Sequence, residues 1–214
     1  PISAGRHIYK RESSFPIAVA CDPAFNFVYE ANIRYLHHLG EVTYFSPLAD
    51  TSLPDDRFVY LPGGYPELYL AALSANRQML QSIRRYVESG GKLLAECGGM
   101  MYLCDEIRDK NGDVYPMAGV LHQSATMENM KLRLGYRTLL YNETRLKGHE
   151  FHYSRLVEQQ NPLPSCAVAY TAKGVETDTP LYHYKNVWAG YTHLYWADPV
   201  GNEWFTKFVI DGNT

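Results

Sequence analysis

Length, composition and charge exclude several classes of protein. The chain has 214 residues, 46% of them hydrophobic and 20% charged, so we expect one large domain with a buried core and no extensive disorder. A net charge of -3, with no run of Lys or Arg, argues against a nucleic-acid partner. No apolar run approaches the ~18 residues of a membrane helix and the first residues are unlike a signal peptide, so we expect no membrane partner and a cytoplasmic location.

The cysteines indicate the redox state of the thiols, and the first residues indicate how the chain is divided into tail and domain. The four cysteines include no CxxC pair and are too sparse for a disulfide scaffold, which predicts reduced thiols. The chain opens on "PISAGRHIYKRESSFP", a polar stretch without an initiator Met that is typical of the end of a linker. We therefore expect a linker-like tail over residues 1–15 and one domain over residues 16–214, taken from a longer protein.

The first half of the chain alternates between strand and helix patterns. Short runs rich in Val, Ile and Leu have the character of buried parallel strands, and the segments between them repeat their apolar residues every three or four positions. This alternation predicts a doubly wound α/β sheet, with sites beyond the carboxyl ends of its strands. In chain order, the expected elements are a strand after Pro16, a helix over 28–39, strands over 41–45 and 57–61, a helical segment over 68–89 interrupted near Ser74 and Asn76, and a strand over 92–96.

From about residue 114, the composition and residue pattern of the chain change. Segments such as "KLRLGYRTLLYN" and "LYHYKNVWAGYTHLYWA" are rich in Tyr, Leu, Val and Thr with polar residues between them, which is typical of antiparallel strands. A closing amphipathic helix is expected over residues 201–210.

Cys97 lies at the point where a strand is expected to turn into a helix. The segment "GGKLLAECGGMMYL" (90–103) places it between an apolar strand and two glycines, so its side chain would project from the carboxyl edge of the sheet. A helix N-terminus favours the reactive thiolate, and glycines bring backbone N–H groups close to an oxyanion. Cysteine is also among the most often buried residues, so this turn alone leaves nucleophile and packing residue evenly balanced.

A thiol nucleophile needs a base, and several histidines compete for that role. His7 lies in the linker-like tail, and His37 and His38 lie on the first expected helix, where a solvated surface position is the simpler interpretation. His193 ends a strand-like run before "DPVGN", which places it at a sheet rim that could face Cys97. A histidine satisfied by hydrogen bonds at a strand end remains the alternative. The full set is His7, His37, His38, His122, His149, His152, His183 and His193.

Two further motifs carry weaker signals. "GHEFHYS" (148–154) holds His149 and His152 three apart in a strand-like segment, where they point to opposite faces, so we expect a pocket wall or structural network and no metal. "LPGGYPELY" (61–69) leaves a strand through two glycines, whose N–H groups could approach a ligand or make an ordinary tight turn. The chain holds no GxxxxGK[ST] motif, so ATP is not bound in the Walker manner.

Taken together, the motifs resemble a known family. "IAVACDPAFNFVYEANIRYL", "FSPLADTSLPD", "LPGGYPELY", "LLAECGGMMYL", "GHEFHYS" and "GYTHLYWA" are similar, in this order, to the C-terminal glutaminase domain of the cobyrinic acid a,c-diamide synthases. The match spans roughly residues 16–197. These domains are class I glutamine amidotransferases, so the resemblance implies a flavodoxin-like, mostly parallel sheet with antiparallel strands added in the C-terminal half.

The resemblance also implies the chemistry and the residues that perform it. Glutamine would be attacked by Cys97 to give a thioester and ammonia, with His193 as base, and water would then release glutamate. The N–H groups of Gly64 and Gly98 would form the oxyanion hole. Gly63 and Tyr65 would bind the substrate.

The family's other half would use the ammonia. The resemblance implies an N-terminal ATP-binding synthetase domain, absent from this chain, that activates the a and c carboxylates of cobyrinic or hydrogenobyrinic acid with ATP and Mg²⁺ in cobalamin biosynthesis. No cofactor and no metal is expected in the glutaminase domain itself. The partners would be glutamine, the synthetase domain and a corrin or other tetrapyrrole.

The sequence departs from the family pattern at two places. Most class I amidotransferases carry a Glu two residues after the catalytic His, but that position holds Tyr195 here. A Cys-His dyad is therefore expected, and any group that orients His193 must come from elsewhere. Cys21, in "VACDPAF", stands where Arg is more usual, with no clear consequence.

Three alternatives stay open. The first is the same domain of nickel-sirohydrochlorin a,c-diamide synthase, which shares these motifs. The other half of the protein binds the acceptor, so the glutaminase motifs do not distinguish the two. A small-molecule cysteine hydrolase on the same fold, of the kind related to intracellular proteases, is a second alternative, against which "GGYPE" and "FSPL" argue. The third is a non-catalytic binding module in which Cys97 is merely packed.

Overall fold

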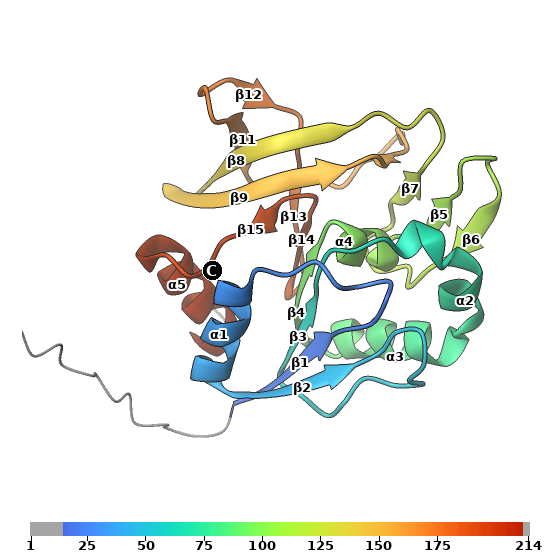
Figure 1. Ribbon diagram of the computed structural model, residues 1–214, viewed down its shortest axis with the longest axis horizontal. Coiled ribbons are helices and arrows are strands. Elements are labelled where there is room, and N and C mark those ends of the chain that lie inside the picture. Colours follow the sequence, from blue (N-terminus) through green and yellow to red (C-terminus); the bar gives the residue numbers. More distant parts are fainter. Residues whose placement is uncertain (1–14, 212–214) are drawn as a thin grey trace, which may run out of the picture.

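The computed structural model describes residues 15–211, and a six-stranded sheet forms its centre (Figure 1). Five of its strands run parallel to one another, and the strand at one edge is antiparallel to its neighbour. In spatial order, the strands are β13 (Leu181–Tyr184), β14 (Val187–Gly190), β4 (Lys92–Glu96), β3 (Phe58–Leu61), β1 (Pro16–Ala20) and β2 (Glu41–Phe45).

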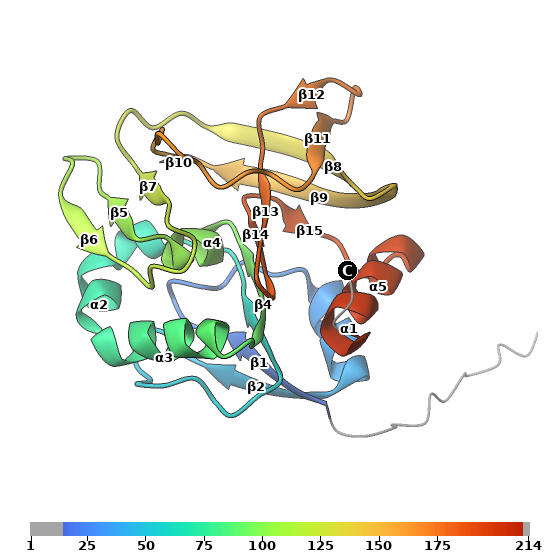
Figure 2. The ribbon, with the colours of Figure 1, turned by 180° about the vertical axis from the view of Figure 1, so that it is seen from behind.

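Helices cover both faces of this sheet, as Figures 1 and 2 show from opposite sides. Successive side chains of a strand point to opposite faces, so Ile17 and Val19 pack in one core and Ala18 and Ala20 in the other. The first face carries α1 (Glu30–Leu39), α5 (Pro199–Thr206) and the π-helical turn that follows it (Lys207–Asp211). The opposite face carries the short 3₁₀ turn Pro66–Leu68, α2 (Leu70–Ala75), α3 (Arg77–Glu88) and α4 (Gly98–Leu103).

Two smaller sheets are added by the second half of the chain. The long hairpin of β8 (Arg133–Tyr141) and β9 (Thr144–His152) lies across the carboxyl edge of the central sheet (Figure 1). Its five-stranded sheet is completed by β11 (Val168–Thr171), β12 (Glu176–Thr177) and β15 (His193–Leu194). The other sheet has four strands, β5 (Glu106–Arg108), β6 (Val114–Pro116), β7 (Ser124–Thr126) and β10 (Arg155–Leu156).

The expected α/β architecture is confirmed, with shifted element ends. The helix expected over 28–39 begins at Glu30. The interruption expected near Ser74 and Asn76 is a break between two helices, where the Asn76 side chain accepts a hydrogen bond from Met79 N and caps α3. The last helix begins at Pro199 rather than residue 201, because Asp198 caps it through Gly201 N.

One expectation for the second half is wrong. The run containing β14 was expected to be antiparallel, but β14 pairs with β4 in parallel and extends the central sheet. The antiparallel expectation is confirmed for the other two strands of this run, since β13 pairs antiparallel with β14 and β15 pairs antiparallel with β9. Residues 1–14 of the expected linker-like tail, including His7, lie outside the described residues, so the domain boundary at residue 16 stays a prediction. Between residues 15 and 211, no helix has the length and apolar character needed to span a membrane.

A buried asparagine ties α1 to the chain beyond β15. Asn32 Nδ2 donates to Leu194 O at 2.7 Å, and Trp196 N donates to Asn32 Oδ1 at 3.0 Å. Asn32 is fully buried. Because no water reaches these groups, this one side chain satisfies both backbone partners and holds the segment next to His193 in place.

Replacing Asn32 by Ala should therefore lower the free energy of unfolding by about 2 to 4 kcal/mol, because two buried backbone groups lose their partner. Urea unfolding followed by circular dichroism measures the change. The matched control is Asn26→Ala, since Asn26 is exposed and bonds only to Pro23 O, and it should cost less than about 0.5 kcal/mol. Equal losses for the two variants would contradict this role of Asn32.

Candidate active site

Cys97 occupies a strained turn between β4 and α4. Its backbone has φ 48° and ψ -106°, a conformation that non-glycine residues rarely adopt and that costs about 1 to 3 kcal/mol. Cys97 N donates to Gly190 O on β14 at 2.7 Å. Gly99 lets the start of α4 approach β3, because a Cβ there would lie 2.1 Å from Leu61 O. The sharp strand-to-helix turn expected from the sequence is thus present.

The Cys97 thiol faces a small cavity under the β8–β9 hairpin. Its side chain is only 5% exposed, and Sγ donates to Phe151 O on β9 at 3.8 Å. The cavity measures about 20 Å³, room for roughly one water molecule. Its lining residues are Gly64, Tyr65, Glu67, Cys97, Met101, Phe151, His152, Tyr153 and Ser154.

Burial keeps this thiol protonated. Burial and, to a lesser extent, the nearby carboxylate of Glu67 raise the pKa of Cys97 to about 12, although the Gly98 N–H acts in the opposite direction. The expectation that a helix N-terminus would favour the thiolate is therefore wrong for the protein at rest. Helix α4 has only six residues, and desolvation outweighs what its N-terminus contributes.

The two glycine motifs meet beside the thiol. A Cβ on Gly98 would lie 3.2 Å from Gly64 N, so the backbones of the two turns are in contact. Gly63 lies on the other side, where a Cβ would come within 2.1 Å of His193 Cε1. Tyr65 is 42% exposed and stands at the rim of the cavity. The structure therefore brings together all six of the expected site residues, Gly63, Gly64, Tyr65, Cys97, Gly98 and His193.

His193 lies on β15, opposite His149 of β9. It is 3% exposed, its ring centroid lies 4.3 Å from that of Phe27, and its Nδ1 has no hydrogen-bond partner within the described part of the chain. Burial lowers the pKa of His193 to about 3, and the neighbouring His149 and His152 act in the same direction. Thiol and imidazole are thus both neutral at rest, and Sγ bonds to Phe151 O rather than to the ring.

Glu96 is a buried carboxylate that the motif analysis did not single out. Its Oε2 accepts from Tyr60 Oη at 2.7 Å and lies 4.0 Å from His193 Nδ1, while its Oε1 accepts from Leu194 N at 3.0 Å. Burial raises its pKa and the bonds from Tyr60 and Leu194 partly offset this effect, so that the pKa is about 8. The available signal was an acidic residue that ends the apolar run 93–95, directly before Cys97.

The "GHEFHYS" segment forms a structural network, as expected. Glu150 is fully buried and pairs with Arg137 at 2.5 Å, with His152 Nε2 at 2.9 Å and with Thr179 Oγ1 at 3.0 Å. Burial alone would raise the pKa of Glu150, but the bond from His152 and the charge of Arg137 hold it below its usual value. Residues 15–211 contain no cluster of three or more His, Cys, Asp or Glu side chains that could hold a metal.

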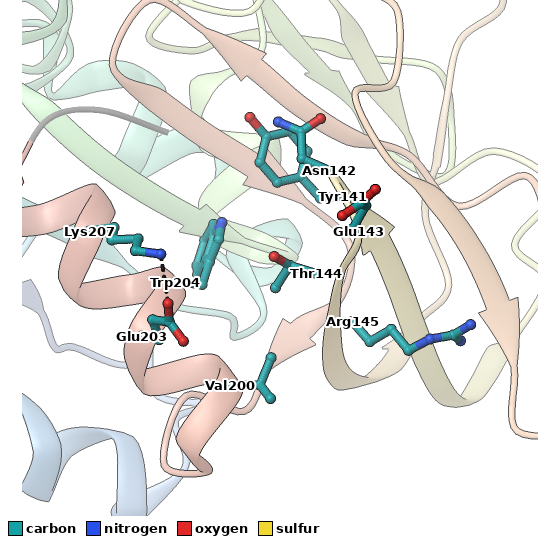
Figure 3. Close-up of a pocket in the computed structure, with 9 residues that line it drawn as sticks. All are labelled: Tyr141, Asn142, Glu143, Thr144, Arg145, Val200, Glu203, Trp204 and Lys207. Carbon is teal, nitrogen blue, oxygen red and sulfur yellow. Dashed lines mark hydrogen bonds and ion pairs between the residues drawn. The ribbon is translucent and has the colours of Figure 1, made fainter.

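A larger hollow lies away from these residues. It has a volume of about 480 Å³ and separates the tip of the β8–β9 hairpin from α5 (Figure 3). Glu203 and Lys207 of α5 pair at 2.6 Å on its rim, and Trp204 forms part of its wall. None of the expected site residues lines it, so size alone does not mark the active site here.

Removing the Glu150 carboxylate should be costly. Glu150→Gln leaves Arg137 without its buried counter-charge and should lower the free energy of unfolding by about 3 to 5 kcal/mol. The control is Glu30→Gln, whose pair with Arg34 at 3.4 Å is exposed and should contribute less than about 0.5 kcal/mol. Chemical denaturation of both variants measures the difference, and similar midpoints would refute the network's contribution.

The raised pKa of Cys97 predicts an unusual pH dependence of its alkylation. Because the thiolate is the reactive form, the rate of reaction with iodoacetamide should rise about tenfold per pH unit from pH 7 to pH 10, without the plateau of an ordinary thiol. Peptide mass spectrometry resolves this site from the other cysteines, and Cys97→Ala provides the blank. A plateau below pH 8 would show that the resting thiol is already activated.

Comparison with known proteins gives the family. Residues 16–200 match the CobB/CobQ-like glutamine amidotransferase domain. Two similar curated proteins are hydrogenobyrinate a,c-diamide synthase of Pseudomonas aeruginosa and cobyrinate a,c-diamide synthase of Fusobacterium nucleatum. Each is 40% identical over 84% of this chain and 41% of its own length. The chain thus spans about two fifths of the length of these relatives.

A solved structure supports the fold. The structure of PurLQS from Thermotoga maritima superposes with a TM-score of 0.58 over 85% of this chain and 88% of that chain, at 18% sequence identity. Since the identity is low, this likeness concerns the fold alone. With a family match over most of its length and relatives at 40% identity, the chain belongs to the CobB/CobQ-like glutamine amidotransferase family.

Proposed function

We propose that this chain hydrolyses glutamine to glutamate and ammonia through a thioester on Cys97. The observation that carries the proposal is the strained turn of Cys97, a buried thiol on the carboxyl edge of the sheet in a chain of this family. A packing cysteine would not need an unfavourable backbone conformation, whereas strain of this kind clusters at functional sites.

His193 acts as the base in this proposal. Its Nδ1 faces Glu96, which leaves Nε2 to take the thiol proton as Sγ attacks the side-chain carbonyl carbon of glutamine. The imidazolium then protonates the leaving nitrogen, so that ammonia departs and the thioester remains. Water, deprotonated by the same imidazole, cleaves the thioester and restores the thiol. The balance is one glutamine and one water consumed for one glutamate and one ammonia.

The glycine turns supply the groups that stabilise the tetrahedral intermediate. The N–H groups of Gly64 and Gly98 are proposed as the oxyanion hole, which the close approach of the two backbones supports. Gly63 and Tyr65 are proposed as substrate contacts. Gly63 sets the space available to the His193 ring, and Tyr65 stands at the cavity rim. A cavity of about 20 Å³ is too small for glutamine, so binding requires the rim to move.

The ammonia is proposed to serve a synthetase domain in the rest of the protein. The longer relatives are named for amidation at the a and c positions of cobyrinate or hydrogenobyrinate, which supports a corrin acceptor and an ATP- and Mg²⁺-dependent partner domain. Amidation of nickel sirohydrochlorin is the alternative acceptor. We place the reaction in the cytoplasm, because the four cysteines are free, as a reducing compartment requires.

A glutamine-mimicking diazo-ketone tests the assignment. It should label Cys97 and no other cysteine of the chain, as read by peptide mass spectrometry, and Cys97→Ala should abolish the labelling. His193→Ala should slow labelling by about 100-fold or more, as loss of a general base does, without loss of the fold by circular dichroism.

Cys104 is the matched control for this experiment, because it is also a buried, free thiol but lies at the end of α4 rather than at its start. Cys104→Ala should leave the labelling rate within about threefold of the starting protein. Labelling at Cys21 or Cys104 in place of Cys97 would refute the proposed nucleophile.

A further inference from the structure

We infer that Glu96, the residue directly before the nucleophile, is the positioning carboxylate of His193. It takes the role of the Glu that most class I amidotransferases carry at the position of Tyr195. This inference rests on the proposed function. It assigns the orienting group of the base to a strand of the central sheet rather than to the segment that carries the base.

The first observation is an unsatisfied nitrogen. His193 Nδ1 is buried without a hydrogen-bond partner in the described structure, a costly arrangement for a polar atom. Glu96 Oε2 lies 4.0 Å away, the shortest ion-pair approach of any carboxylate to this nitrogen among the described residues. A shift of about 1 Å would turn this approach into a charge-assisted hydrogen bond.

The second observation is that Glu96 is itself fixed. Tyr60 Oη holds Oε2 at 2.7 Å, and Leu194 N holds Oε1 at 3.0 Å. A carboxylate oxygen can accept more than one hydrogen bond, so Oε2 has capacity left for His193. Because Leu194 follows His193 in the chain, Glu96 anchors the backbone of the base and faces its ring at the same time.

Glu150 and Tyr195, two other groups that could orient His193, are engaged elsewhere. The Glu150 carboxylate already pairs with Arg137 and is hydrogen-bonded to His152 and Thr179. Tyr195 is 38% exposed and packs edge-on against Tyr29, at 5.8 Å between ring centroids. His149 and His152 also face His193, and as cations they would oppose its protonation rather than support it.

The arrangement fixes which nitrogen of the ring carries the proton. A carboxylate at Nδ1 favours the Nδ1–H tautomer, which leaves the lone pair of Nε2 for the thiol proton. When the imidazolium forms, its positive charge stabilises the ionised form of Glu96, which burial alone disfavours. The carboxylate therefore acts through His193 and does not touch the substrate.

The test compares Glu96→Gln with the unmodified chain in two measurements. Inactivation by the diazo-ketone should show kinact lowered by about 100-fold or more with KI changed less than about threefold, because the base is misoriented while the cavity keeps its shape. In ¹⁵N-histidine NMR, the His193 signal, assigned with His193→Gln, should be the Nδ1–H tautomer in the unmodified chain at pH 8.5 and should leave that state in the variant.

Tyr60→Phe is the matched control, since it removes a hydrogen bond to the same carboxylate oxygen and keeps the carboxylate. It should retain the Nδ1–H tautomer. An unchanged kinact and tautomer in Glu96→Gln would overturn the inference. Should that variant fail to fold, an Nε2–H tautomer of His193 in the unmodified chain would overturn it as well.

The two proposals fail differently. If Cys97 is not labelled at all, the proposed function fails. The tautomer of His193 in the unmodified chain reports on the pair with Glu96 without any reaction at Cys97.

Discussion

The site depends on one constraint, the turn that joins β4 to α4. Cys97 is held at φ 48° because its backbone N–H is bonded to Gly190 on β14 and because Gly99 packs against the carbonyl of Leu61 on β3. Both contacts come from strands of the central sheet. The strain at Cys97 is therefore maintained by the central sheet, and the glycines of the neighbouring turns can approach the thiol closely.

The burial that maintains this turn also sets the protonation of the site. It raises the pKa of Cys97 to about 12 and lowers that of His193 to about 3, so the resting pair is neutral. Once the thiol sulfur has attacked the substrate, the imidazolium needs a negative charge nearby, in a region that water does not reach. Glu96 is the buried carboxylate placed to supply it, held by Tyr60 and Leu194 beside the imidazole.

The sequence predicted the features that depend on local pattern. The strand pattern before Cys97 and the glycines after it correctly indicated the turn, and Asn76 marked the helix break. Contacts between distant segments could not be predicted in this way. The parallel pairing of β14 and the approach of Glu96 to His193 join residues about a hundred positions apart, and alternation along one strand does not identify its neighbours. The prediction of a thiolate at Cys97 was wrong for a similar reason. Nearby residues indicate that Cys97 lies at a helix N-terminus, but its burial, which sets its pKa, depends on the whole fold.

Cavity size and protonation lead to the same conclusion about the resting protein. The space before Cys97 holds about one water molecule, and the thiol's hydrogen bond goes to a backbone carbonyl of β9 rather than to His193. Phe151 therefore has two parts in this site, since it lines the cavity and its carbonyl accepts the hydrogen bond of the thiol. A substrate that reaches Cys97 has to compete with that bond for the sulfur.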